Sequence, residues 1–121
     1  MKRYIASYLV DIGGIYQYKY IDYVQALEYY IRSLNICEDI GDKNGIGKSL
    51  YAIGNVYVQK GNLEKALGYY NRSLNLHEEL GNDLLKGHRF FDIGETYWYK
   101  GDLDKSTYYY NRSLKIFELL D

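Results

Sequence analysis

YYNRSLN at 69–75 is one of three nearly identical phrases in the chain, the others being YYIRSLN at 29–35 and YYNRSLK at 109–115. The segments around them align throughout: IGGIYQYKYIDYVQALEYYIRSLNICEDIGD (12–42), IGNVYVQKGNLEKALGYYNRSLNLHEELGN (53–82) and IGETYWYKGDLDKSTYYYNRSLKIFELLD (93–121). The first segment has one extra residue, around positions 20–22. A period of about forty residues is typical of proteins that stack copies of one supersecondary unit. The sequence therefore predicts three structural repeats.

Each unit is predicted to form two amphipathic helices joined by a turn. In the second unit, apolar residues recur at spacings of three and four on both sides of the turn, at Leu50, Ile53, Val56 and Tyr57 and then at Leu63, Ala66, Leu67, Tyr70, Leu74 and Leu76. The turn itself has a glycine suited to a helix end and an N-cap residue, a pair that recurs as Gly41-Asp42, Gly61-Asn62, Gly81-Asn82 and Gly101-Asp102. The predicted helices are 3–19, 23–40, 44–60, 63–80, 83–100 and 103–120.

Three glycines fall inside predicted helices, where glycine costs about 1 kcal/mol relative to alanine. They are Gly13, Gly54 and Gly94. A small residue lies one helix away from each, at Ala26, Ala66 and Ser106. We expect each glycine to pack against this small residue, with tyrosines filling the rest of the core within the unit.

The pattern resembles the tetratricopeptide repeat over practically the whole chain. Its marks in the second unit are Leu50, Ile53-Gly54, Tyr57, Ala66, Tyr70 and Ser73-Leu74, and the other two units match them. The resemblance implies a single all-α domain over 1–121, an α-solenoid whose units cover about 3–40, 43–80 and 83–120. Its six antiparallel helices would form a right-handed superhelix. The sequence departs from the family in two ways: it lacks the proline that usually follows the second helix of a repeat, and its period is near forty in place of 34. Such a period is found in long-period members of the family.

Composition argues against several classes of protein. The 15 basic and 16 acidic side chains nearly cancel, which argues against binding to nucleic acid or to anionic lipid. No apolar run approaches the roughly 20 residues needed to span a bilayer, and the N-terminal segment lacks the long apolar stretch of a secretory signal. A single cysteine, Cys37, makes no internal disulfide. We expect a cytoplasmic protein.

No motif indicates catalysis, a metal or a cofactor. Asn71 and Asn111 begin glycosylation sequons, but both are predicted to lie in the middle of a helix, and the repeated serines Ser33, Ser73 and Ser113 are better explained as small residues at a tight helix crossing. His77 and His88 lie on different helices, so a zinc site is not expected. Cys37 is expected to pack as a small apolar residue between repeats. We predict that the protein is not an enzyme.

A partner is expected on the concave face, which the first helix of each unit lines. The residues on this face differ from unit to unit while the packing residues repeat. The candidate binding residues are Asp11, Lys48, Tyr51, Asn55, His88, Phe91, Asp92, Glu95, Trp98 and Tyr99.

The chemistry of this candidate groove predicts the kind of ligand. The clamp that holds acidic chaperone tails in the family would need basic and amide residues, and of its positions here only Asn55 agrees. The candidate groove is instead acidic and aromatic, which favours a peptide or protein segment with aromatic or apolar anchors and a lysine or arginine. We therefore predict a protein-interaction module that binds such a segment.

The two ends offer an alternative functional surface. No further helix follows the last one, so apolar side chains are expected to be exposed there and on the first helix, at Tyr4, Ile5, Tyr8, Ile116, Phe117, Leu119 and Leu120. These residues suggest a module that forms homo-oligomers through its terminal helices. A third interpretation is a peptide-sensing regulatory domain of a larger bacterial signalling protein.

Overall fold

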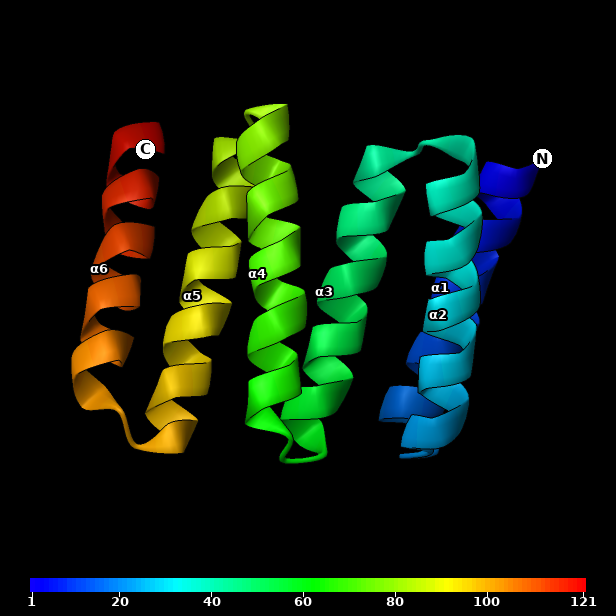
Figure 1. Cartoon of the computed structure of the whole chain (residues 1–121), viewed down its shortest axis with the longest axis horizontal. Helices are drawn as coiled ribbons and strands as arrows, with labels where there is room; N and C mark the ends of the chain where they lie inside the picture. The colour runs from blue at the N-terminus through cyan, green and yellow to red at the C-terminus, as the bar shows by residue number, and fades with distance from the viewer.

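The computed structural model describes residues 1–121 as six α-helices without strands. The helices are α1 (Lys2–Tyr18), α2 (Tyr23–Ile40), α3 (Lys43–Gln59), α4 (Leu63–Leu80), α5 (Asp83–Lys100) and α6 (Leu103–Leu120). Every predicted helix is present, with its ends displaced by no more than one residue. The helices stand side by side along the long axis of the molecule, and the two termini lie at opposite ends of this axis (Figure 1). The prediction of an all-α solenoid is confirmed.

The joints between helices have the predicted chemistry. Four glycines have left-handed φ angles between 67° and 83°, namely Gly41, Gly61, Gly81 and Gly101. The residue after each glycine is an N-cap whose side chain accepts a backbone N–H, as Asn82 does from Leu85 at 3.0 Å. The first joint differs because it carries the extra residue. There Ile21 takes the positive φ, 53°, and Asp22 caps α2.

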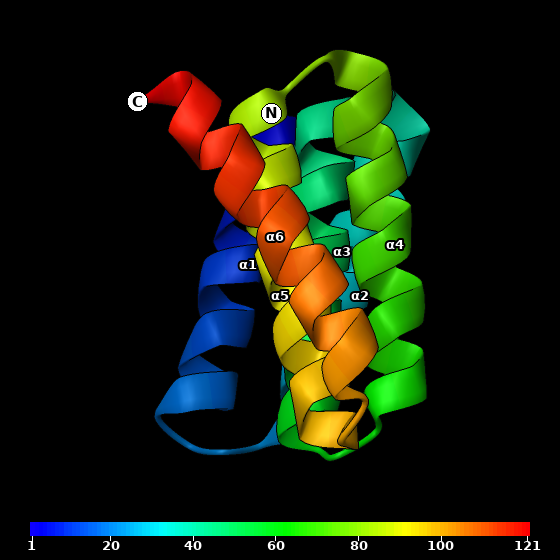
Figure 2. The same ribbon diagram turned by 90° about the vertical axis from the view of Figure 1, so that its left-hand side faces the viewer.

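In the first two units, the second helix packs against the first helix of its own unit and against the first helix of the next unit. The most extensive helix contacts are within units, in the pairs α1·α2, α3·α4 and α5·α6, and the next are between units, in the pairs α2·α3 and α4·α5. The core follows this pattern, since Leu34 of α2 clusters with Leu50 and Ile53 of α3. Helix α6 has α5 on one side and no helix on the other, as the view onto the C-terminal end shows (Figure 2).

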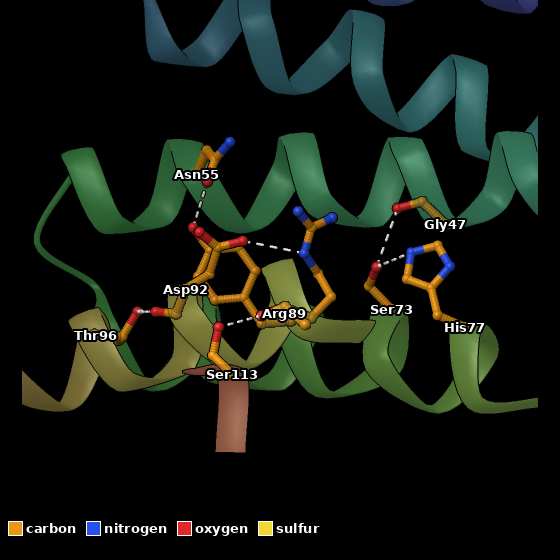
Figure 3. A network of polar contacts seen from close by, with 10 residues as sticks. Gly47, Asn55, Ser73, His77, Arg89, Asp92, Thr96 and Ser113 are labelled. Carbon is orange, nitrogen blue, oxygen red and sulfur yellow. Dashed lines mark hydrogen bonds and ion pairs between the residues drawn. The ribbon is translucent and has the colours of Figure 1, made fainter. Parts of the chain in front are cut away.

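The serine of the repeated phrase is a packing residue. Ser33, Ser73 and Ser113 are all buried. The Ser73 hydroxyl donates to the Gly47 carbonyl at 3.3 Å, and the Ser113 hydroxyl donates to the Gly87 carbonyl at 2.8 Å (Figure 3). The phrase is therefore part of the architecture: its serine joins the two helices of a unit in the second and third units, and the Ser33 hydroxyl lies 3.1 Å from the Ser49 hydroxyl of the next unit.

The glycines inside the helices have a different role from the predicted one. A Cβ atom built on Gly54 would lie 2.7 Å from a ring carbon of Tyr70, and the same modification of Gly13 and Gly94 would meet the rings of Tyr30 and Tyr110. The atoms nearest to each added Cβ thus belong to a tyrosine ring and not to the predicted small residue. Each glycine instead leaves room for the ring of a tyrosine that comes from the second helix of its unit.

Candidate partner-binding surface

The first-helix face is the surface of α1, α3 and α5 that carries the ten candidate groove residues. Tyrosines from the second helices reach it past the glycines. The Tyr30 hydroxyl donates to Gln17 Oε1 at 2.6 Å, and Gln17 Nε2 donates to Gln59 Oε1 at 2.9 Å. In the next unit, the Tyr70 hydroxyl donates to Asn55 Oδ1. Side chains of the second helices therefore supply part of the polar floor beneath the first-helix face.

Burial fixes the protonation of these tyrosines. The rings of Tyr30 and Tyr70 are each 3% exposed. Loss of water raises the pKa of Tyr30 to about 12, and it raises the pKa of Tyr70 further above the ordinary value. Both hydroxyls stay protonated and act as hydrogen-bond donors over the physiological pH range.

A partly buried ion pair joins α5 to this floor. Arg89 Nε lies 3.0 Å from Asp92 Oδ2, and the Arg89 guanidinium sits over the Tyr51 ring, 3.7 Å from its centroid (Figure 3). A cation this close to an aromatic face is attracted by the ring quadrupole. Arg89 thus connects Asp92 to Tyr51 and so holds the third unit to the second.

Asp92 lies on the predicted surface but is not a free acid. Its side chain is half-buried beside Arg89. Burial raises the pKa of Asp92 to about 6, while Arg89 opposes the shift and Glu95 adds to it. Because its charge is already balanced by Arg89, Asp92 offers little charge to a ligand.

Exposed aromatic side chains follow one face of α5. Phe91, Trp98 and Tyr99 are all exposed, and Glu95 lies between them at helical spacing. Phe91 leans on Tyr110, with ring centroids 5.4 Å apart, and Trp98 contacts Tyr99 edge to face at 5.4 Å. Glu95 forms no ion pair in the structure. This strip of α5 combines accessible aromatic area with an acid that has no cationic partner.

The remaining candidate residues are spread along the face. Asp11 is exposed on α1 and His88 is exposed on α5, where its ring lies 5.1 Å from that of Phe117. Lys48 lines a hollow of about 220 Å³ between α1, α2 and α3, together with Arg3 and Cys37. The structure thus gathers Tyr51, Asn55, Asp92 and Glu95 around the Tyr70 hydroxyl and leaves Asp11, Lys48 and His88 apart from them.

Cys37 packs between repeats, as predicted. It is buried, and its sulfur is the nearest neighbour that a Cβ atom on Gly45 would meet. No group of three or more histidine, cysteine or carboxylate side chains could hold a metal ion. None of the six helices combines the length and apolar character needed to cross a membrane.

The end faces agree with the prediction only in part. Tyr4, Ile5 and Tyr8 are exposed on α1, and Leu119 and Leu120 are exposed on α6. Ile116 and Phe117 were expected to be free but are half-buried, because Ile116 packs on the core of the second and third units and Phe117 fills the space that Gly87 leaves.

Sequence reasoning missed Arg89 as a member of the site. A lone arginine on an amphipathic helix is usually assigned to solvent, since arginine is rarely buried without a partner. The aligned positions carry Tyr8 and Ser49, so the repeat itself gave no indication of a charge there. The usable signal was the spacing of Arg89 and Asp92, three residues apart on one helix, which permits an ion pair.

Comparisons with known proteins identify the architecture. The sequence profile described as tetratricopeptide repeat matches residues 4–79 and 45–118. A search of curated proteins gives no match.

Three solved structures illustrate the similarity. The TPR domain of Arabidopsis FLU has a TM-score of 0.88 and 17% identity, with 98% of this chain and 99% of that chain covered. A STAND signal-transduction ATPase with a tetratricopeptide repeat sensor from Pyrococcus horikoshii has a TM-score of 0.86 and 25% identity, with 93% and 17% covered. The TPR2AB domain of yeast Sti1, in its pHSP90 complex, has a TM-score of 0.78 and 24% identity, with 92% and 40% covered.

These matches cover very different shares of the similar chains. The chain spans nearly all of the FLU domain, but less than half of several other similar chains. The profile covers both halves of the sequence, and the glycine, tyrosine and serine positions that build the structure are those by which the repeats align. The chain belongs to the tetratricopeptide repeat family.

Proposed function

We propose that the first-helix face binds a segment of a partner protein that carries an aromatic or large apolar anchor and a lysine or arginine. Tetratricopeptide repeat domains are protein-interaction modules, and the Sti1 neighbour was solved as a pHSP90 complex. The observation that carries the proposal is the strip of α5 in which Phe91, Trp98 and Tyr99 are exposed around Glu95. We propose a binding role without catalysis.

The chemistry of the strip determines which ligand fits. Aromatic side chains supply much of the binding energy at protein interfaces, because they bury a large area at low conformational cost. Glu95 has no cation of its own and can pair with a basic side chain of the ligand, and the faces of Trp98 and Tyr99 can hold the same cation. Asp92 is left out of this proposal because Arg89 already balances its charge.

An acidic chaperone tail is a poor fit to this surface. Such a tail would place carboxylates beside Glu95 and Asp11, where like charges repel. The one strong cation near the floor, Arg89, is buried and already paired with Asp92. The proposed ligand therefore differs in charge from an acidic tail.

Selection from a random-peptide phage library against the immobilised chain would test the proposal. We expect the enriched peptides to share an aromatic residue and a lysine or arginine. Trp98→Ala should weaken the best peptide by about 30-fold, the effect of losing an aromatic hot spot, and Glu95→Lys should weaken it by about tenfold or more. Trp98 also allows binding to be followed through its fluorescence.

The matched control is Tyr108→Ala. Tyr108 is an exposed aromatic residue of α6 that lies away from the first-helix face, at a position where the other units have Glu28 and Gly68. Its replacement should leave peptide binding unchanged. Peptides that bind Trp98→Ala and Glu95→Lys as tightly as the parent would show that the ligand surface lies elsewhere.

A further inference from the structure

The exposed faces of α1 and α6 correspond to the two surfaces that meet at the α2·α3 and α4·α5 interfaces. Leu114 of α6 aligns with Leu34 and Leu74, which the following unit buries to 7% and 8% exposure, whereas Leu114 is 55% exposed. On α1, Ile15 aligns with Val56 and Thr96, which the preceding unit buries to 0% and 1%, whereas Ile15 is 50% exposed. Each end therefore exposes the positions that an internal interface covers.

The internal interfaces show what each exposed side chain would meet. Leu34 of α2 clusters with Leu50 and Ile53 of α3, and Leu74 of α4 clusters with Phe90 and Ile93 of α5. The residues of α1 that align with these pairs are Leu9 and Ile12. In the same register, Leu114 of one copy would pack on Ile12 of another.

A charge pair points to the same register. At the α4·α5 interface, Lys100 contacts Glu64. The position aligned with Glu64 in the last unit is Asp104, and the position aligned with Lys100 in the first unit is Lys19. Stacking of one copy on another in the internal register brings Asp104 and Lys19 together with the same polarity. Neither residue forms an ion pair within the chain.

We propose that the α6 face of one copy binds the α1 face of a second copy, in the register of the α2·α3 and α4·α5 interfaces. This contact joins two different surfaces, so each bound copy leaves one further α6 face and one further α1 face free. Association therefore continues beyond a dimer into an open series. The proposal is independent of the first-helix face, which stays accessible along the stack.

The end positions differ from the internal interfaces at several sites, among them Tyr4, which stands where α3 has Gly45 and α5 has Leu85. Tyr8 stands where Ser49 lies in α3, but Arg89 occupies the same position in α5, so a large side chain is compatible with this packing. Thr107 replaces Leu27 and Leu67. Ile5 matches Ile46 of the α2·α3 interface and differs only from Lys86 of the α4·α5 interface, whose ammonium lies 3.8 Å from Glu78. The stacked interface thus lacks one apolar contact that both internal interfaces have, and we expect it to be weaker than they are.

Light scattering of the 121-residue chain over about a hundredfold range of concentration tests the proposal. The average mass of the parent should rise from that of one 14.3 kDa chain and pass twice that value without a plateau. Leu114→Asp destroys the α6 face and Ile15→Asp destroys the α1 face, and both replaced side chains are exposed. Each variant alone should remain a monomer. An equimolar mixture should form a dimer and stop there, since each variant retains one intact face.

Controls and contrary outcomes follow from the same design. Tyr108→Asp, at an exposed position outside both faces, should associate like the parent. Tyr8→Asp provides a second α1 variant should Ile15→Asp lose helicity. A parent that stays monomeric throughout would overturn the proposal and leave the faces for a different protein. Single variants that still form dimers would overturn it in favour of a symmetric contact between like faces, and so would a mixture of two folded variants that does not associate.

Discussion

Replacing Gly54 by alanine tests whether the glycines inside the helices exist for the tyrosine rings. Alanine is the better helix former, and in an open helix it gains about 1 kcal/mol over glycine. At Gly54, however, the new methyl group would lie 2.7 Å and 2.8 Å from two ring carbons of Tyr70, against about 3.5 to 4.0 Å for an unstrained carbon contact. The ring must therefore move by roughly 1 Å.

Tyr70 has little freedom to make this movement. Its ring is buried, and its hydroxyl is held by Asn55 on the same helix as Gly54. Overpacking of this kind costs about 1 to 3 kcal/mol, and a weakened hydrogen bond adds about 1 kcal/mol. After the helix gain is subtracted, Gly54→Ala should lower the free energy of unfolding by about 1 to 3 kcal/mol.

Gly68→Ala is the matched control. Gly68 lies in α4, is exposed, and has no atom within 4 Å of the position a Cβ would take. The same substitution should therefore raise the free energy of unfolding by about 1 kcal/mol. Urea unfolding followed by far-UV circular dichroism, at low protein concentration so that association does not contribute, measures both variants.

Two results would refute the reasoning. One is a Gly54→Ala variant that is as stable as Gly68→Ala. The other comes from the background of Tyr70→Leu, in which the ring is absent and Gly54→Ala should lose most of its penalty. If the penalty is unchanged there, its cause is not the ring.

Two further predictions concern Asp92 and the helix caps. The pKa of Asp92 is about 6 in the folded protein and near 3.8 in the unfolded chain. Its contribution to stability is therefore fully present below pH 4 and is lost as the pH rises through 6, a loss of about 3 kcal/mol. Urea titrations at several pH values should show that Asp92→Asn removes this fall of the free energy of unfolding with pH. An Asp92→Asn variant with the slope of the parent would contradict the assignment. In the same titration, Asn82→Ala should lower the free energy of unfolding by about 1 kcal/mol, because it removes the hydrogen bond to the Leu85 amide. The control Asn111→Ala, at an exposed position in the middle of a helix, should not lower it. Equal effects of the two variants would show that Asn82 does not act as a cap.

The helices could be predicted from the sequence because each is specified locally and the same signals occur three times. A glycine and a capping Asp or Asn mark most joints, and apolar spacing identifies the buried face of each helix. The joint at Ile21 has no glycine and was located by aligning the first unit with the other two. A non-glycine residue adopts the positive φ there.

The candidate site was less predictable because its chemistry depends on contacts between helices. Asp92 was predicted to lie on the first-helix face as a free acid, but its charge state depends on Arg89, which also contacts Tyr51 one unit away. The roles of Gly54 and Tyr70 likewise depend on the direction in which a ring crosses from α4 to α3. Helical periodicity tells which residues share a face, but it does not tell which side chain extends into the neighbouring helix.

The tyrosine hydroxyls pass beside the glycines and reach the first-helix face from the second helices. Residues that a ligand does not touch can therefore help to determine which ligand is bound. Tyr30 and Tyr70 orient Gln17 and Asn55 from helices that a ligand on the first-helix face need not reach. Evolution could therefore change the hydrogen-bonding pattern of this face by substitutions in the outer layer of the solenoid. A mutational scan for specificity confined to the inner helices would overlook that layer.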